Sequence, residues 1–256
     1  MRRSQLASIR RASAIAWDPE HEWCPPGHGD LYPALVTSGM LDALVEHGYE
    51  FLFVSNSDNL GAVVDADILS WFAAQRLPFL MEVVVRTAAM RKGGHLARRR
   101  GDGDRLVLRE AAQVPDGDVD AFQDVSRHRF FNTNNLWLHV PSLAEALRDG
   151  DGVLPLPLIR NAKTVDPADP SSTKVYQLET AMGAAIEVFP GARALLVDAD
   201  RFAPVKTTND LLVVRSDATI LADDWRILPN PERQGRPLVV DLDPEHYKLV
   251  DDFEKR

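Results

Sequence analysis

The side chains of this sequence that could do chemistry fall in four short polar stretches. A histidine stands between two glycines, a carboxylate follows a buried strand, asparagines cluster beside a tryptophan, and a lysine follows an apolar pair. The stretches are "CPPGHGDLYPAL" (24–35), "SNSDNLGA" (55–62), "FNTNNLW" (131–137) and "RFAPVKTTNDLL" (201–212). Imidazole, carboxylate, amide and ammonium groups together can bind metal ions, hydroxyls and phosphates.

His28 is the first candidate. Gly27 and Gly29 leave its ring uncrowded, because glycine has no Cβ and lets the backbone approach a ligand closely. The imidazole can therefore meet a substrate, although a Pro/Gly turn with a surface histidine would have the same sequence. For Asp30, just behind, capping of the next helix is favoured over catalysis.

The second stretch follows a short apolar run, 49–56, that is typical of a buried strand. Asn56, Asp58 and Asn59 should thus lie at the carboxyl edge of a sheet, where α/β proteins bind ligands. A carboxylate at such an edge often anchors Mg²⁺, which prefers oxygen ligands. An Asx turn between strand and helix is the alternative for Asp58.

The last two stretches suit a sugar and a phosphate. Each amide of 131–137 both donates and accepts hydrogen bonds, as sugar hydroxyls require, although a capped turn would also contain asparagines. Lys206 could neutralise a phosphate or be an exposed loop lysine.

The elements that must position these groups alternate along the chain. Helical spacing of apolar residues predicts helices over 33–48, 63–75, 142–149 and 175–189. Apolar runs predict strands over 49–56, 78–87, 134–140 and 192–198, and a hairpin over 93–114 that turns at 101–104. This order predicts an α/β fold with a mixed, mostly parallel sheet.

Composition narrows the classes of function. The chain has 256 residues, 45% hydrophobic and 26% charged, and a net charge of −9, which disfavours binding to nucleic acid. A single cysteine, Cys24, excludes an internal disulfide framework and a Cys-rich zinc site. No apolar run approaches the ~20 residues that span a membrane. We expect a cytoplasmic protein.

The beginning of the chain differs from the rest. We expect residues 1–22 to be a basic, poorly ordered segment and residues 23–256 to form the folded domain. The first seventeen residues hold four arginines and no acid, which also fits a mitochondrial presequence.

Six motifs in one order resemble a known family. They are "PPGHGDLYPAL", "FVSNSDNLGAVVD", "KGGHL", "FNTNNLW", "VYQLETAMGAAI" and "FAPVKTTNDLLVV". From about residue 23 onward the chain resembles the UTP–glucose-1-phosphate uridylyltransferases. The resemblance implies a Rossmann-like, glycosyltransferase-A-like nucleotidyltransferase domain. It also implies Mg²⁺-dependent formation of UDP-glucose and diphosphate from UTP and glucose 1-phosphate.

Roles follow from the resemblance. Gly27 corresponds to a glycine at the uridine base and His28 to a histidine at the sugar phosphate. Asn56 and Asp58 correspond to nucleotide-binding residues, with Asp58 at the Mg²⁺, and Lys206 to the lysine at the phosphates. The hexose-facing positions are Glu110 and Asn134, although another asparagine of "NTNN" is the alternative, and Gly94 lets the backbone approach the sugar. Glu179 could face the same pocket or be a carboxylate on a helix surface.

Two expected parts of the family pattern have no match here. We find no GGxGT-like loop followed by a catalytic lysine after a proline, and no C-terminal β-helix. We therefore expect an N-terminally incomplete domain with little or no activity alone. Whether the protein forms a homo-oligomer is left open by the sequence. The alternatives are a sugar-nucleotide-binding remnant and a metal-dependent phosphohydrolase using His28, Asp30 and Asp58.

Overall fold

The computed structural model describes residues 26–256, except 92, 102, 104, 167, 168, 170 and 237. The segment 1–22, which we expected to be poorly ordered, lies outside the described residues. Within the described part, no helix is long and apolar enough to cross a membrane.

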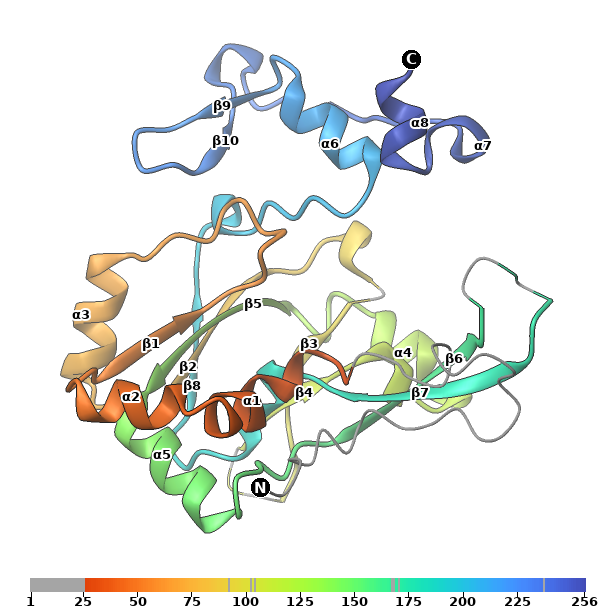
Figure 1. The fold of residues 1–256 in the computed structure, drawn as a ribbon. Helices are drawn as coiled ribbons and strands as arrows, with labels where there is room; N and C mark the ends of the chain where they lie inside the picture. Colours follow the sequence, from red (N-terminus) through yellow and green to blue (C-terminus); the bar gives the residue numbers. More distant parts are fainter. Residues whose placement is uncertain are drawn as a thin grey trace.

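A six-stranded sheet forms the centre of the molecule (Figure 1). Its strands are β1 (Phe51–Val54), β2 (Phe79–Val85), β3 (His95–Arg98), β4 (Leu106–Arg109), β5 (Phe130–His139) and β8 (Arg193–Leu196). Their order is β4-β3-β5-β2-β8, and β1 also pairs with β5.

The mixed α/β sheet is confirmed, but the expectation of mostly parallel pairing is wrong. Among the described strands, the only parallel pair is β2 with β8. A helical connection does join β1 to β2, as in parallel units, yet β5 lies between them and runs antiparallel to both. The inserted strand comes from later in the chain, so the local βαβ pattern cannot reveal it.

Strand β5 leaves a gap on one edge. Along one edge it pairs with β2 at residues 130–132 and 136–138, with a register shift between these two runs. Along the other it meets β3 only at Phe131, and β1 from Leu136 onward. No described strand therefore lies beside residues 133–135 on this edge, and the backbone there bends through Asn134, whose φ is 61°.

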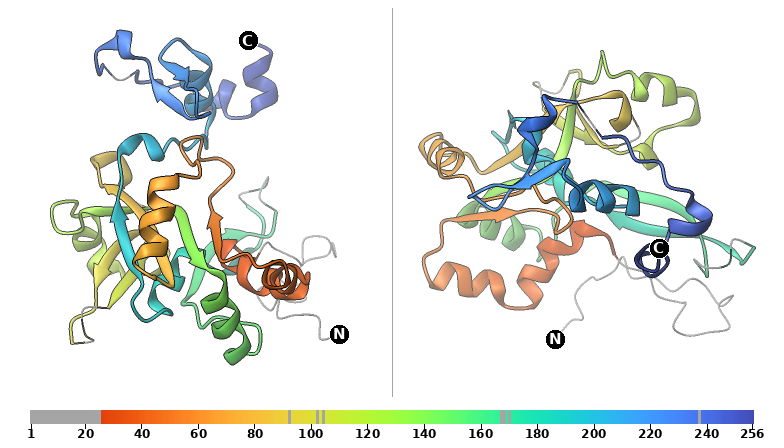
Figure 2. Two further views of the ribbon diagram at one scale, coloured as in Figure 1. Left: turned by 90° about the vertical axis from the view of Figure 1, so that its left-hand side faces the viewer. Right: turned by 90° about the horizontal axis from the view of Figure 1, so that it is seen from above.

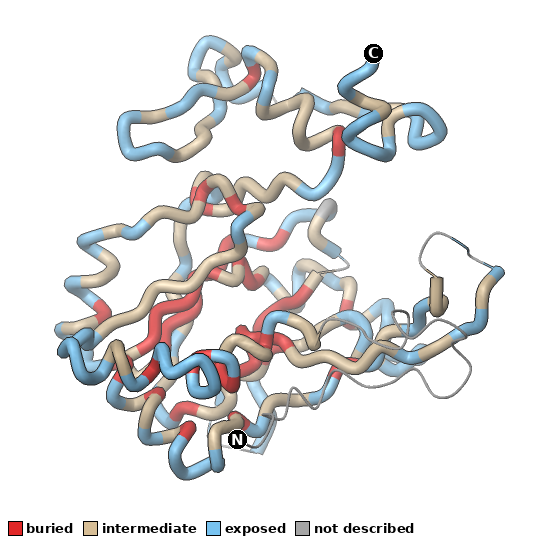
Figure 3. Tube along the Cα trace, viewed as in Figure 1, coloured by how far each residue is buried: buried red, intermediate tan, exposed pale blue. Residues whose placement is uncertain are grey.

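Helices cover both faces of the sheet (Figure 2). Helix α3 (Ala66–Ala74), capped by the Asp65 side chain, packs Phe72 against Leu80 and Trp137 on one face. The larger core on the other face includes Leu138 and Leu143, and buried residues concentrate along the central strands (Figure 3). The other helices here are α1 (Leu31–Thr37), α2 (Met40–Glu46), α4 (Val119–Gln123) and α5 (Val140–Asp149).

Two predicted helices differ in the structure. The helix expected over 33–48 is broken into α1 and α2 at Gly39, whose φ of 75° is left-handed. The helix expected over 175–189 is wrong. Lys174–Thr180 forms β7, which pairs with β6 (Leu158–Thr164), and Met182–Glu187 follows as the 3₁₀ helix η6. Long-range pairing with β6 overrides the local apolar spacing.

A small lobe lies above the sheet and contains the C-terminus (Figures 1 and 2). It contains α6 (Thr208–Arg215), β9 (Thr219–Leu221), β10 (Ile227–Pro229), α7 (Pro244–Tyr247) and α8 (Val250–Glu254). The remaining 3₁₀ helices are η2 (His28–Asp30), η3 (Ala88–Met90), η4 (Ala111–Gln113), η5 (Asp116–Asp118), η7 (Ala199–Arg201) and η8 (Pro231–Arg233). Segment 202–207 joins the lobe to the sheet.

Buried His95 predicts a loss of stability in acid. Its ring nitrogens are buried without partners among the described residues, and it stacks against His128. Burial, followed by the charges of His128, Arg86 and Arg109, lowers the pKa of His95 from 6.5 to about 3. Below pH 6.5 the unfolded chain therefore binds a proton at His95 that the folded protein does not bind. The stability that neutral His95 contributes is fully present above pH 6.5 and is lost progressively as the pH falls toward 3.

We expect His95→Leu to make the unfolding free energy less dependent on pH between pH 7 and pH 5. Between pH 7 and pH 5, the unfolding free energy of the parent chain should fall by about 2 kcal/mol more than that of the variant. Urea unfolding at the two pH values measures both. Equal losses in the two proteins would contradict the assignment.

Candidate functional site

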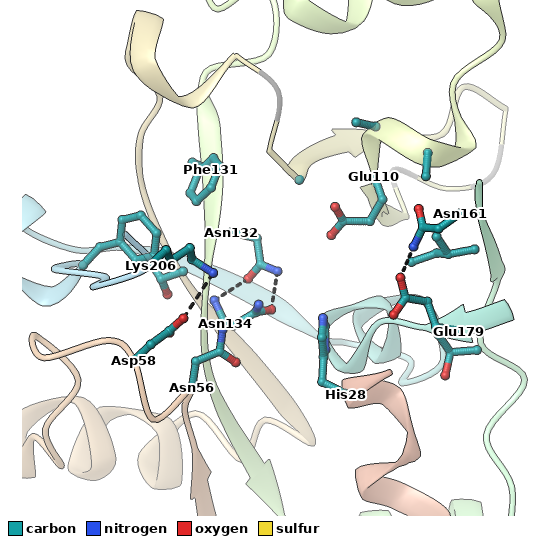
Figure 4. Close-up of a pocket in the computed structure, with 17 residues that line it drawn as sticks. His28, Asn56, Asp58, Glu110, Phe131, Asn132, Asn134, Asn161, Glu179 and Lys206 are labelled. Carbon is teal, nitrogen blue, oxygen red and sulfur yellow. Dashed lines mark hydrogen bonds and ion pairs between the residues drawn. The ribbon is translucent and has the colours of Figure 1, made fainter. Parts of the chain in front are cut away.

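A cavity of about 420 Å³ opens at the gap in the β5 edge. In Figure 4, Asp58 and Lys206 lie at one end and Glu110, Glu179 and Asn161 at the other, with His28 and Asn134 between them. The lining residues are His28, Asn56, Asp58, Gly94, Glu110, Ala111, Ala112, Phe131, Asn132, Thr133, Asn134, Ile159, Asn161, Glu179, Thr180, Phe202 and Lys206.

His28 lies in η2, just before α1, and is held in one orientation. The backbone N–H of Met182 donates to its Nδ1 at 2.9 Å. Because Nδ1 accepts, the proton of the neutral ring is on Nε2, which leaves a donor free for a ligand. Partial removal from water, and then the charge of Lys206, lowers the pKa of His28. The ring is thus set up as a neutral donor.

Asp58 and Lys206 come from distant segments and form an ion pair of 3.3 Å. The backbone N–H of Val205 donates to the carbonyl oxygen of Asp58 at 2.9 Å, which ties the two segments together. The second carboxylate oxygen of Asp58, Oδ1, is buried without a hydrogen-bond partner among the described residues. An orphaned carboxylate oxygen fits a hard cation such as Mg²⁺.

Asn59 fixes the loop that carries Asp58. Its Oδ1 accepts from the backbone N–H groups of Gly61 and Ala203, at 3.2 and 2.8 Å. Its Nδ2 donates to Asn135 Oδ1 and to the carbonyl oxygen of Arg201, both at 3.1 Å. One amide therefore binds the loop after β1, strand β5 and the segment leading to Lys206.

Asn59 contacts a residue of a buried ion pair, Arg201 with Glu82. Arg201 donates from Nε and Nη2 to the two carboxylate oxygens of Glu82, each at 2.7 Å. Asn135 and Trp137 donate to the same carboxylate at 3.0 and 2.9 Å. Glu82 is fully buried in β2. Such a carboxylate is stable in the interior because donors surround it.

The asparagine cluster of β5 divides between two environments. Asn132 and Asn134 line the cavity, and the Nδ2 of Asn132 donates to Asn134 Oδ1 at 2.7 Å. The Oδ1 of Asn132 accepts from the backbone N–H of Asn134 at 2.9 Å. This pairing holds Asn134 in its left-handed conformation. Asn135 instead belongs to the Glu82 network.

Two carboxyl groups face the other end of the cavity. Burial, and then the charge of Glu179, raises the pKa of Glu110 from 4.5 to about 7. Asn161 on β6 donates to Glu179 Oε1. Near neutral pH, Glu110 can therefore both donate and accept hydrogen bonds, which suits a hydroxyl-rich ligand.

Glycines allow the walls to close. A Cβ at Gly29 would meet Thr180 Oγ1 at 2.2 Å, and one at Gly94 would meet Glu110 Oε1 at 2.4 Å. Gly27, whose φ is +84°, packs against Glu179 but does not line the cavity itself. At Gly29 the close approach of η2 to the backbone of Thr180 leaves no room for a side chain, whereas a side chain at Gly94 would displace the carboxyl group of Glu110.

Of the positions predicted from sequence, His28, Asn56, Asp58, Glu110, Asn134 and Lys206 line the same cavity, as do Gly94 and Glu179. Asp30 does not line it and stands at the N-cap of α1, where its side chain makes no capping bond. Sequence reasoning missed Asn161 and the Glu82–Arg201 pair. No pattern in the sequence marked Asn161. A glutamate within the apolar run 79–85 was the one sequence sign of the buried polar network, and the structure shows that this residue, Glu82, is buried.

The phosphohydrolase alternative would need more metal ligands around His28 and Asp58. Among the described residues, the one group of three or more candidate ligands is the exposed set Asp243, Glu245 and His246 in the C-terminal lobe. These residues do not line the cavity.

Sequence comparison places residues 3–256 under the family model for UTP–glucose-1-phosphate uridylyltransferase. Enzymes of that name from Solanum tuberosum and Saccharomyces cerevisiae are 44% and 41% identical to it, covering 89% and 93% of the chain. The match covers 46% of each relative, so the chain spans about half the length of these curated relatives.

Solved structures agree. A mutant UDP-glucose pyrophosphorylase from Leishmania major superposes with a TM-score of 0.84 at 52% identity, covering 94% of this chain and 52% of that one. Another mutant of the Leishmania major enzyme, crystallised in complex with UDP-glucose, gives the same TM-score and identity. A protein from Trypanosoma brucei, described as UDP-glucose phosphorylase, also gives 0.84 at 52% identity, covering 93% and 51%.

Removing the charge of Glu82 should unfold the protein more easily. Glu82→Gln leaves the buried Arg201 with only its longer ion pair of 3.6 Å to the partly exposed Asp65, which costs about 3 to 5 kcal/mol of unfolding free energy. Glu254→Gln is the matched control, because its pair with Arg215 is exposed and contributes less than about 1 kcal/mol. Similar losses in the two variants, measured by urea unfolding, would contradict the network's structural role.

Glu110→Gln should stabilise the protein in alkali. Because the pKa of Glu110 is higher in the folded protein than in the unfolded chain, its ionisation lowers the unfolding free energy progressively as the pH rises from 4.5 to about 7. The variant avoids this loss, and its advantage is complete above pH 7. We expect it to exceed the parent by about 1 to 3 kcal/mol at pH 8, with no gain at pH 4.5. Exposed Glu232→Gln is the control, and a pH-independent effect would refute the burial of Glu110.

Proposed function

The chain belongs to the UTP–glucose-1-phosphate uridylyltransferase family, and from this premise we propose that it binds UDP-glucose and takes part in uridylyl transfer. The reaction joins UTP and glucose 1-phosphate to give UDP-glucose and diphosphate. Because the chain spans about half of its curated relatives, the activity of the whole enzyme is part of the proposal.

The observation that carries the proposal is the division of the cavity. One end has an ammonium group and a carboxylate with an orphaned oxygen, Lys206 and Asp58. The other has amides and a carboxyl group with a pKa near neutrality, Glu110. A phosphate-bearing ligand with a hydroxyl-rich sugar needs these two chemistries at opposite ends of one cavity.

In the proposed step, a phosphate oxygen of glucose 1-phosphate attacks the α-phosphorus of UTP. The new P–O bond forms as the bond to the β-phosphate bridging oxygen breaks, and diphosphate leaves with that electron pair. Lys206 neutralises charge on the phosphates, and Nε2–H of His28 donates to an oxygen of the sugar phosphate. Asn134 and Glu110 orient the hexose, and Asn56 contacts the nucleotide.

Asp58 would hold the Mg²⁺ of the reaction. Its buried, unpartnered Oδ1 is the donor that fits this ion. When bound, the ion would supply charge neutralisation at the phosphates. Lys206, already paired with Asp58, would shift toward the nucleotide, since its side chain is 60% exposed and has room to move.

A second candidate function is sugar-nucleotide binding without turnover. It is favoured by the lining of the cavity, whose donors and acceptors suit a sugar nucleotide. Calorimetry with UDP-glucose and an assay of diphosphate release from UTP and glucose 1-phosphate separate the two. Binding with turnover supports the enzyme, binding alone supports the second candidate, and absence of both refutes the proposal.

Lys206 and Asp58 should have different effects on binding. Lys206→Ala should weaken UDP-glucose binding by roughly 10- to 100-fold with or without Mg²⁺, because a charge-assisted contact is lost. Asp58→Asn should abolish only the part of the affinity that depends on Mg²⁺. Calorimetry with and without the ion measures both effects.

Lys255→Ala is the control, because this exposed lysine pairs with Asp252 and neither residue lines the cavity. Equal effects of Lys206→Ala and Lys255→Ala would contradict the phosphate assignment. A Mg²⁺ effect that persists in Asp58→Asn would contradict the ion assignment.

A further inference from the structure

A second depression lies beside the β3–β4 hairpin and shares no lining residue with the cavity described above. Its volume is about 770 Å³. We call it the arginine groove; it is lined by Val83, Leu96, Ala97, Arg98, Arg100, Leu106, Arg127, His128, Arg129, Phe130, Ala192, Arg193, Ala194 and Leu196. These residues come from the hairpin, β2, the start of β5 and β8, with the segments leading into β5 and β8.

The charge of the arginine groove is one-sided. Five arginines and one histidine line it, and none of its lining residues is acidic. Among the described residues, Arg100, Arg127 and Arg193 have no ion-pair partner. The chain as a whole carries a net charge of −9, so this concentration of positive charge runs against its composition. Such a surface attracts anions from solution.

The floor of the arginine groove is apolar and joins the buried core. Val83 and Leu96 belong to the buried core, and Phe130, Ala192 and Ala194 pack against it. Arg129 lies over the ring of Phe130, with its guanidinium carbon 5.8 Å from the ring centre. An apolar floor with a few convergent polar groups, in a volume of this size, is typical of a small-molecule site.

The cationic side chains of the arginine groove are arginines and not lysines, which favours phosphate as the ligand. All five basic side chains of the rim are arginines, and their planar guanidinium groups bind phosphate oxygens in pairs. They converge from separate segments on one depression, which suits a compact polyanion. His128 adds a ring whose Nε2 is buried and has no partner among the described residues.

We propose that the arginine groove binds a small organic anion with two or more phosphate groups and an apolar or aromatic body. The phosphates contact the arginine rim, and the body lies on the floor formed by Val83, Leu96 and Phe130. This site is separate from the proposed sugar-nucleotide cavity, so it stands or falls independently of the proposed function.

Calorimetry with inorganic triphosphate and with ATP tests the proposal. Triphosphate probes the rim alone, and ATP adds an aromatic body, so ATP should bind more tightly. Arg127→Gln/Arg129→Gln and Arg193→Gln should each weaken both ligands at least tenfold. Binding should also weaken as salt is raised, because the rim is exposed.

Two further proteins separate the arginine groove from other sites. Arg76→Gln/Arg148→Gln removes two exposed arginines elsewhere on the surface and should change affinity less than twofold. Lys206→Ala weakens phosphate binding in the other cavity and should leave binding in the groove intact. Thermal unfolding checks that each variant is folded.

Loss of binding in the groove variants, with retention in Lys206→Ala, supports the proposal. Loss in Lys206→Ala alone would assign both ligands to the first cavity and overturn it. Equal weakening by the groove and control substitutions would reduce the effect to general surface charge and also overturn it. Triphosphate binding equal to that of ATP would refute the role of the apolar floor.

Discussion

The salt bridge between Glu82 and Arg201 is the constraint on which the candidate site depends. It joins the centre of the sheet to η7, which precedes the segment carrying Lys206. Asn135 and Asn59 extend the network to β5 and to the loop carrying Asp58. Buried charges are costly unless they are paired, so the two hydrogen bonds from Arg201 to Glu82 and the donors Asn135 and Trp137 favour this arrangement. Four distant parts of the chain are thereby fixed relative to one another.

The gap in the β5 edge is the second requirement. A strand beside residues 133–135 would fill the space where the cavity opens; no strand in the described part of the chain lies there, and amide side chains face the pocket. The left-handed turn at Asn134 and the contacts at Gly29 and Gly94 shape the walls around that opening. Pairing of β5 with β2 before and after this segment supplies support, and the open edge supplies access, as a binding site needs.

Much of this could be predicted from sequence, where signals are local. Strands β1, β2 and β8, helix α3 and the β3–β4 hairpin lie within the ranges their apolar patterns predict. The four polar stretches contributed His28, Asp58, Asn134 and Lys206 to one cavity. The failures are non-local. Antiparallel insertion of β5 between β1 and β2, and the pairing of β7 with β6, depend on contacts between segments far apart in the chain.

The convergence of these segments on one ligand is the central claim, and amide hydrogen exchange with and without UDP-glucose tests it most directly. The account predicts that the ligand slows exchange simultaneously in segments 27–30, 56–60, 132–134 and 203–206, while exchange in the C-terminal helices α7 and α8 stays unchanged. Protection confined to one of these segments, or spread evenly over the chain, would contradict it.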